Sequence, residues 1–190
     1  MAKDTALIVI DLQEAMRADR DAGYPWANPD APATAGRILA AFRVAGLSVW
    51  HVHHNGDDPA DGFHPDNPLV VAMPEVAPVL GEPVIVKLGS SAFIGTGLEA
   101  RLRAAGLTRL VIVGGEANMC VESTTRMAGN LGFQTTVVAD ALVNFQRTLR
   151  DGRVMPPEVV LEMPLANLTS FARIVDSAEL LAEIRTEIRT

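Results

Sequence analysis

The sequence has little cysteine and no long apolar run, and each of these shortages excludes a kind of protein or site. Because Cys120 is the only cysteine in 190 residues, neither an internal disulfide nor a CxxC metal site can form. The longest apolar runs, at residues 6–10 and 69–73, are too short to cross a bilayer. No signal-peptide pattern is found, so we expect a cytoplasmic protein with no membrane partner.

Net charge and composition argue against two further classes, nucleic-acid-binding proteins and disordered proteins. Sixteen basic residues against twenty-three acidic ones give a net charge of −7, which disfavours a nucleic-acid partner. Hydrophobic residues make up 48% and charged residues 21%, values that argue against disorder. A chain of this length can bury a core of its own, so we expect a single domain over residues 1–190.

Apolar runs alternate with amphipathic helical stretches along the chain. The patterns predict strands at residues 5–11, 47–52, 83–87, 108–113, 133–139 and 172–175, and helices at 34–45, 97–105, 120–131 and 178–186. Residues 13–32 are predicted to be a loop with at most a short helix, 53–83 a long irregular loop, and 141–168 broken helical pieces. This alternation predicts an α/β fold: a three-layer α/β/α domain with a doubly wound, mostly parallel sheet.

Polar residues stand where several of the predicted strands end. Asp11 ends the first strand, Lys87 the third and Asp140 the fifth, while the stretch GGEANMC places Cys120 near the start of the helix after the fourth. Lys87 is also unusual because sixteen basic residues include only one other lysine, Lys3. Open α/β sheets bind ligands beyond the carboxyl ends of their strands, so we expect a carboxylate, a cation and a thiol to converge there.

This set of side chains suits nucleophilic catalysis by a thiol. We expect Lys87 and the helix N-terminus to lower the thiol pKa of Cys120 below its usual value of about 8.5. Asp11 could take the thiol proton and later deliver it to a leaving group, while backbone N–H groups of the loop at residues 114–120 receive an oxyanion. The residues alone also allow purely structural roles. Cys120 could be a buried apolar side chain, Lys87 a surface cation and Asp11 a helix N-cap.

Several segments together resemble the isochorismatase-like cysteine hydrolase superfamily, which includes nicotinamidases, N-carbamoyl amidohydrolases and isochorismatases. The matching segments are ALIVIDLQ (6–13), EPVIVKLGSSAFIGTGLEARLRAAG (82–106) and LVIVGGEANMCVESTTRMAGNLGFQTTVVADA (110–141), with weaker similarity at 164–168 and 171–181. The resemblance implies a Rossmann-like fold with Cys120 as the nucleophile, Asp11 as the general acid/base and Lys87 as the third catalytic residue. It also implies a cis peptide at Gly115–Glu116, with the N–H groups of Glu116 and Cys120 as oxyanion donors.

The sequence departs from the family pattern near the nucleophile. Many members have a threonine where Ala117 stands and a small apolar residue where Glu116 stands, so we expect Glu116 to reshape the pocket mouth. The residues that we expect to contact substrate are Gln13, Phe93, Met119 and His53, with core packing as the other reading of Phe93 and Met119.

The histidine cluster offers a possible metal site, but its spacing is wrong for one. The residues are His51, His53, His54, Asp57 and His64, and they do not reproduce the Asp and His pattern that binds a metal in nicotinamidases. We therefore expect neither a metal nor another cofactor. Strand alternation places His51 and His53 on one face and His54 on the other.

The leading hypothesis for function is a cofactor-free cysteine amidohydrolase that cleaves the C–N bond of a small amide, carbamoyl or ureido compound through a thioester. One alternative is isochorismatase-type hydrolysis of an enol ether, against which Cys120 counts because that chemistry needs no thiol. Another is a catalytically silent binding domain. We expect a small-molecule substrate, and the resemblance implies a homo-oligomer, either a dimer or a tetramer.

Overall fold

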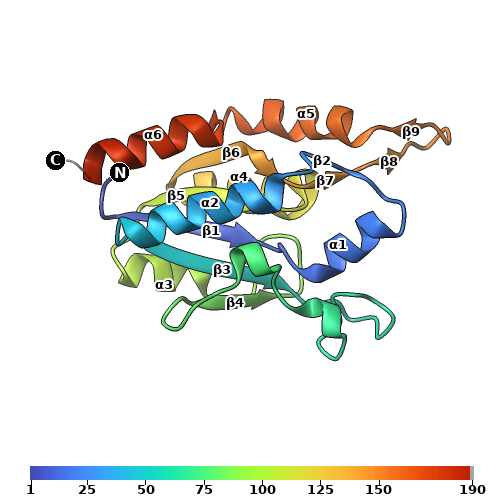
Figure 1. Cartoon of the computed structure of the whole chain (residues 1–190), viewed down its shortest axis with the longest axis horizontal. Coiled ribbons are helices and arrows are strands. Elements are labelled where there is room, and N and C mark those ends of the chain that lie inside the picture. Colours follow the sequence, from blue (N-terminus) through green and yellow to red (C-terminus); the bar gives the residue numbers. More distant parts are fainter. Residues whose placement is uncertain (189–190) are drawn as a thin grey trace.

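The computed structural model describes residues 1–188, and a six-stranded sheet forms its centre (Figure 1). The strands are β1 (Thr5–Ile10), β3 (Ser48–His54), β4 (Val84–Lys87), β5 (Arg109–Gly114), β6 (Gln134–Leu142) and β10 (Arg173–Val175). Their order across the sheet is β10-β6-β5-β1-β3-β4, and every neighbouring pair is parallel. The predicted doubly wound parallel sheet is confirmed, and the strand order reverses between β1 and β5, which places the ligand crevice at their carboxyl ends.

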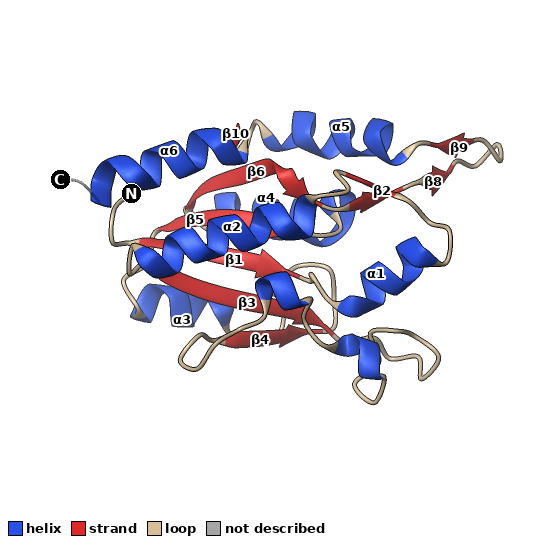
Figure 2. Cartoon of the chain, viewed as in Figure 1, coloured by secondary structure: helices blue, strands red, loops and turns tan. Residues whose placement is uncertain are grey.

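Helices cover both faces of the sheet (Figure 2). On one face, α2 (Ala31–Val44) and α6 (Ser177–Ile188) pack through buried side chains such as Phe42 and Leu180. The other face carries α3 (Leu98–Ala104), α4 (Glu122–Asn130) and α5 (Pro157–Leu168). The prediction of three layers is therefore confirmed.

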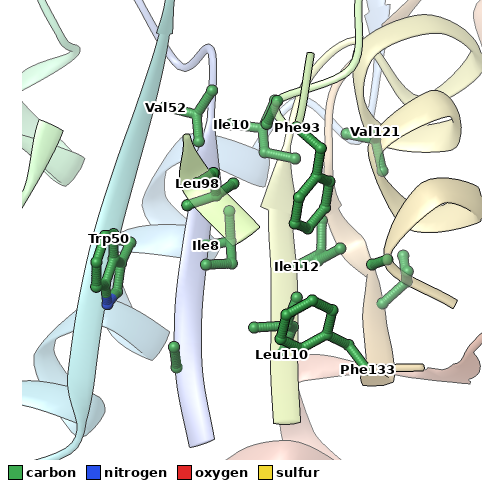
Figure 3. Close-up of a cluster of buried hydrophobic side chains, with 14 of the residues drawn as sticks. Ile8, Ile10, Trp50, Val52, Phe93, Leu98, Leu110, Ile112, Val121 and Phe133 are labelled. Atoms are coloured by element: carbon green, nitrogen blue, oxygen red, sulfur yellow. The ribbon is translucent and has the colours of Figure 1, made fainter. Parts of the chain in front are cut away.

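The apolar run of β1 is continuous because both of its faces are buried. Leu7 and Val9 belong to the cluster under α2 and α6. Ile8 and Ile10 point into the opposite cluster, where Figure 3 shows them with side chains that include Leu98 of α3. A strand of a parallel sheet covered on both faces has this pattern rather than a strict apolar and polar alternation.

Residues 141–155 are not helical, so that part of the prediction for 141–168 is wrong. β6 continues to Leu142, β7 (Asn144–Phe145) pairs with β2 (Trp26–Ala27), and β8 (Arg147–Thr148) forms a hairpin with β9 (Val154–Met155). The backbone partners of β7 lie far away in the sequence, which local periodicity cannot reveal. Only α5, over Pro157–Leu168, agrees with the helical prediction.

Smaller differences concern the ends of elements. The short helix allowed within residues 13–32 is α1 (Glu14–Asp21), and α2 starts earlier than predicted, at Ala31, with Pro32 in its first turn, where a missing N–H is tolerated. The helix predicted at residue 120 is preceded by a π-helical turn, η3 (Ala117–Val121). The irregular segment after β3 contains two short 3₁₀ turns, η1 (Pro68–Val70) and η2 (Pro74–Val76).

The loops gather at one end of the molecule. Figure 1 shows the strand arrows pointing toward the end where α1 and the β8–β9 hairpin lie. The carboxyl ends of the strands, where the candidate residues stand, therefore face these connections. None of the described helices is long and apolar enough to span a membrane.

Candidate active site

Asp11, Lys87 and Cys120 come together at the carboxyl ends of the central strands. The Nζ atom of Lys87 lies 2.7 Å from Oδ2 of Asp11 and donates a hydrogen bond to Sγ of Cys120 at 3.2 Å. Asp11 and Lys87 are each only 1% exposed, whereas Cys120 is partly exposed. The three side chains expected to form the site thus make one cluster, in which Cys120 is the only partly exposed residue.

The chain holds Asp11 in an unusual backbone conformation. Its φ of 52° lies in the left-handed region, which a residue other than glycine adopts only when its surroundings hold it there. The Asp11 N–H donates to the Val52 carbonyl at 2.9 Å, and its own carbonyl accepts from the Gln13 N–H at 2.8 Å. These bonds fix the carboxylate just beyond the end of β1.

Gly114 lets β5 approach that same end of β1. A Cβ atom at this position would lie 2.0 Å from the Ile10 carbonyl oxygen, and the φ of 128° also excludes most side chains. The two strands that flank the switch point can therefore approach each other only with glycine here. This contact sets the start of the loop that carries Cys120.

Gln13 lies beside the cluster, but its side chain binds the protein backbone. The amide nitrogen donates to the carbonyls of His54 at 3.0 Å and Val70 at 2.7 Å, and the amide oxygen accepts from the His54 N–H at 2.8 Å. The residue is fully buried. Gln13 therefore clamps the turn after Asp11 to β3 and to η1.

His54, rather than His53, neighbours the cluster of Asp11, Lys87 and Cys120. In the sheet His54 is paired with Lys87 and His53 with Val86, so His54 shares the face of Lys87. Burial first, and the positive charge of Lys87 next, lower the pKa of His54. Its ring packs edge-on against Phe63 at 5.5 Å between centroids. The sequence separates the two faces correctly, but it does not show which face meets Lys87.

The remaining expected substrate contacts divide into buried and exposed residues. Phe93 is 8% exposed and stacks on Phe133 inside the apolar cluster of Figure 3. Met119 is 46% exposed next to Cys120 in the sequence, and its sulfur accepts a hydrogen bond from Arg147. His53 lies on the face opposite Lys87, where burial and the charge of His51 lower its pKa to about 4. Of these residues, the structure leaves Met119 open beside Cys120.

The loop before Cys120 has the geometry that the resemblance implies. The Gly115–Glu116 peptide bond is cis. The Glu116 carboxylate accepts a hydrogen bond from Arg147 at 2.7 Å, and this ion pair borders a hollow of about 340 Å³ that Phe63 and Asp19 also line. Glu116 thus lines this hollow together with Arg147, whereas Asp11, Lys87 and Cys120 are not among its lining residues.

The pKa of the Cys120 thiol differs from the value expected from the sequence. Burial, followed by the negative charge of Asp11, raises the pKa of Cys120 to about 12, and Lys87 opposes this rise only in part. Burial also raises the pKa of Asp11, again against the effect of Lys87. The expected lowering of the thiol pKa is wrong because one cation does not offset burial and a facing carboxylate.

Two other polar groups singled out by the sequence have structural partners. The Asp140 carboxylate accepts the N–H of Ser177 at 2.7 Å and its hydroxyl at 2.5 Å, at the start of α6. His51 is buried, with its Nε2 atom 2.8 Å from Glu82. Within residues 1–188, no three His, Cys, Asp or Glu side chains gather as metal ligands would.

The family model for the isochorismatase domain matches residues 5–153, a stretch that contains every residue of the cluster. The chain belongs to the isochorismatase family. Its members are hydrolases. In this isochorismatase-family hydrolase, the loop before Cys120 and the buried ion pair of Asp11 and Lys87 form the candidate active site.

Relatives of this isochorismatase-family chain match over nearly its whole length. The family protein YrdC of Bacillus subtilis is 33% identical, and the match covers 95% of this chain and 96% of that protein. A crystal structure of a protein assigned to the family from Chromobacterium violaceum is 39% identical with a TM-score of 0.91, covering 98% of this chain and 96% of that one. A ureidoacrylate amidohydrolase of Stutzerimonas stutzeri is 31% identical over 94% of this chain and 81% of its own length.

Proposed function

We propose that this protein is a cysteine amidohydrolase that cleaves a C–N bond in a small amide, carbamoyl or ureido compound. The observation that carries the proposal is the Lys87 ammonium, which contacts Asp11 and Cys120 at 2.7 and 3.2 Å in one buried cluster. The similarity to a ureidoacrylate amidohydrolase supports the choice of substrate class. Cys120 is the nucleophile, Asp11 the general acid and base, and Lys87 the cation that stabilises both.

Formation of the acyl-enzyme requires two proton transfers, from Cys120 to Asp11 and from Asp11 to the leaving nitrogen. The thiol proton of Cys120 passes to the Asp11 carboxylate as the sulfur attacks the substrate carbonyl carbon. The oxyanion is held by backbone N–H groups of Glu116 and Cys120. The C–N bond then breaks, Asp11 returns the proton to the nitrogen, and ammonia or an amine leaves behind a thioester.

Hydrolysis of the thioester repeats these steps with water. Asp11 takes a proton from the water as its oxygen attacks the thioester carbonyl, and the C–S bond breaks to release the acid. The departing thiolate regains the proton from Asp11. Throughout, Lys87 stays protonated, and the site carries one negative charge, which lies on Asp11, on the oxyanion of a tetrahedral intermediate or on the departing thiolate, so its net charge stays constant.

A substrate panel with nucleophile variants tests this function. Small amides, N-carbamoyl amino acids, ureido acids, nicotinamide and isochorismate would be screened for release of ammonia, amine or pyruvate. Because Cys120 is the single cysteine, an intact-mass increase equal to the acyl group would report the thioester without ambiguity. We expect Cys120→Ala to abolish both turnover and the mass increase.

The same panel contains the results that would refute the proposal. Undiminished C–N cleavage by Cys120→Ala would exclude the thiol mechanism. Pyruvate release from isochorismate that persists in Cys120→Ala would instead identify enol-ether hydrolysis. Cys120→Ser serves as the matched control, because it keeps the shape of the site while replacing the sulfur.

A further inference from the structure

The hollow beside Glu116 and Arg147 contributes no group to the reacting cluster. It has a volume of about 340 Å³ and is lined by residues of α1, β7 and β8 and of the loops near them. Pockets that bind small molecules combine apolar and aromatic walls with a few polar groups that orient the ligand. The walls of this hollow have that composition, with four large apolar or aromatic side chains: Met16, Tyr24, Phe63 and Phe145.

Two residues of the hollow connect it to the reacting cluster. Met16 packs against the cis-peptide loop, since a Cβ atom at Gly115 would lie 3.0 Å from the Met16 sulfur. Phe63 contacts the ring of His54, which shares a face of the sheet with Lys87. The hollow therefore lies beside the cluster, at the end of the molecule where the central strands finish (Figure 1). A substrate whose carbonyl carbon is at the reacting sulfur can extend its far end into this hollow.

The charged groups that line the hollow are two carboxylates and one guanidinium, and they are not balanced. The guanidinium of Arg147 donates to the Glu116 carboxylate at 2.7 Å and to Oδ1 of Asn118 at 3.4 Å, so its charge is already paired. The Asp19 carboxylate lines the same hollow and has no hydrogen bond or ion pair within residues 1–188. Burial, followed by the negative charge of Asp61, raises the pKa of Asp19. The hollow thus contains a free anion that has no cation of the protein beside it.

We propose that this hollow binds a cationic end of the substrate, so that the amide, carbamoyl or ureido compound carries an ammonium or guanidinium group. The inference rests on the proposed function, whose substrate it makes more specific. The cation pairs with Asp19, and the aromatic rings of Tyr24 and Phe63 contact its methylene stem and its charge. An anionic end finds no free partner, because Glu116 already pairs with Arg147 and Asp19 repels it.

Three ureas of similar length but different charge test the site: aminopentylurea, hexylurea and ureidohexanoate. Calorimetric titration into Cys120→Ala measures their binding without turnover. We expect aminopentylurea to bind at least about tenfold more tightly than the other two, because only its ammonium forms a charge-assisted hydrogen bond with Asp19. Adding Asp19→Asn should remove this preference, and Asp19→Lys should transfer it to ureidohexanoate. Asp21→Asn is the matched control, because Asp21 belongs to the same helix but pairs with Arg20 at 2.7 Å and does not line the hollow.

Any of three results would overturn the proposal: no binding of aminopentylurea, equal or tighter binding of hexylurea or ureidohexanoate, or a preference for the cation that persists in Asp19→Asn. Gain of ureidohexanoate binding by Asp19→Lys would show that the variant is folded. Ammonia release by the wild-type protein tests the proposed function separately. A preference for the cation without any turnover would refute the amidohydrolase reaction while supporting the cation site.

Discussion

The Lys87 ammonium donates a hydrogen bond to the Cys120 sulfur at 3.2 Å, yet the thiol is not made acidic. Burial and the Asp11 carboxylate raise the pKa of this thiol to about 12. A standing thiolate would place two negative charges beside one cation in a buried site. The geometry instead favours proton transfer within the cluster, since moving the thiol proton to Asp11 leaves one charge of each sign.

Asp11→Asn should change turnover and thiol reactivity in opposite directions. We expect turnover to fall by about 10² or more because the general base is lost. Alkylation of Cys120 by iodoacetamide at neutral pH should become faster, since removal of the carboxylate charge lowers the thiol pKa and leaves Lys87 to stabilise the thiolate. Intact mass against time, measured across pH, gives the rate. Alkylation slower than in wild type would contradict this account.

Lys87→Met should destabilise the fold as well as the reaction. The substitution leaves the Asp11 carboxylate buried without its partner, so we expect the free energy of unfolding at neutral pH to fall by about 3 kcal/mol. Adding Asp11→Asn removes the unpaired charge and should recover part of that loss. Urea unfolding of the two variants measures both effects, and a double variant less stable than Lys87→Met would speak against charge compensation.

Gln13→Ala should affect catalysis from a position that touches no reacting atom. The variant loses three hydrogen bonds to buried backbone groups. We expect the free energy of unfolding to fall by about 2 to 3 kcal/mol, and kcat to fall more than KM rises, because the turn that holds Asp11 loosens. The control is Gln134→Ala, at an exposed position of β6. Equal effects of the two variants on stability and on kcat would show that Gln13 does not position the turn that holds Asp11.

His53 should make the protein less stable in mild acid. Burial, with the charge of His51, lowers the pKa of His53 from 6.5 to about 4. Between these values the unfolded chain binds a proton that the folded chain does not, so stability falls as pH decreases from about 6.5 to 4. His53→Gln should flatten this part of the curve. The free energy of unfolding by urea at several pH values measures the slope, which would stay unchanged if His53 were not responsible.

Much of the fold follows from local features of the sequence. The run at residues 6–10 is apolar at every position because β1 is covered on both faces, and apolar runs bounded by turn residues mark the other central strands. The strand-end rule then brings Asp11 and Lys87 to one edge, because parallel strands end on the same side. Local patterns fail at residues 141–155, where pairing with distant backbone replaces the predicted helix.

The sequence by itself determined the parallel α/β architecture and the meeting of Asp11, Lys87 and Cys120, because these depend on short patterns and on strand direction. Only the tertiary structure decided that His54 adjoins Lys87, that Gln13 clamps backbone, and that the thiol pKa rises. Those properties depend on register, burial and the distance between charges. Each of them arises from contacts between residues far apart in the chain, which no local pattern records.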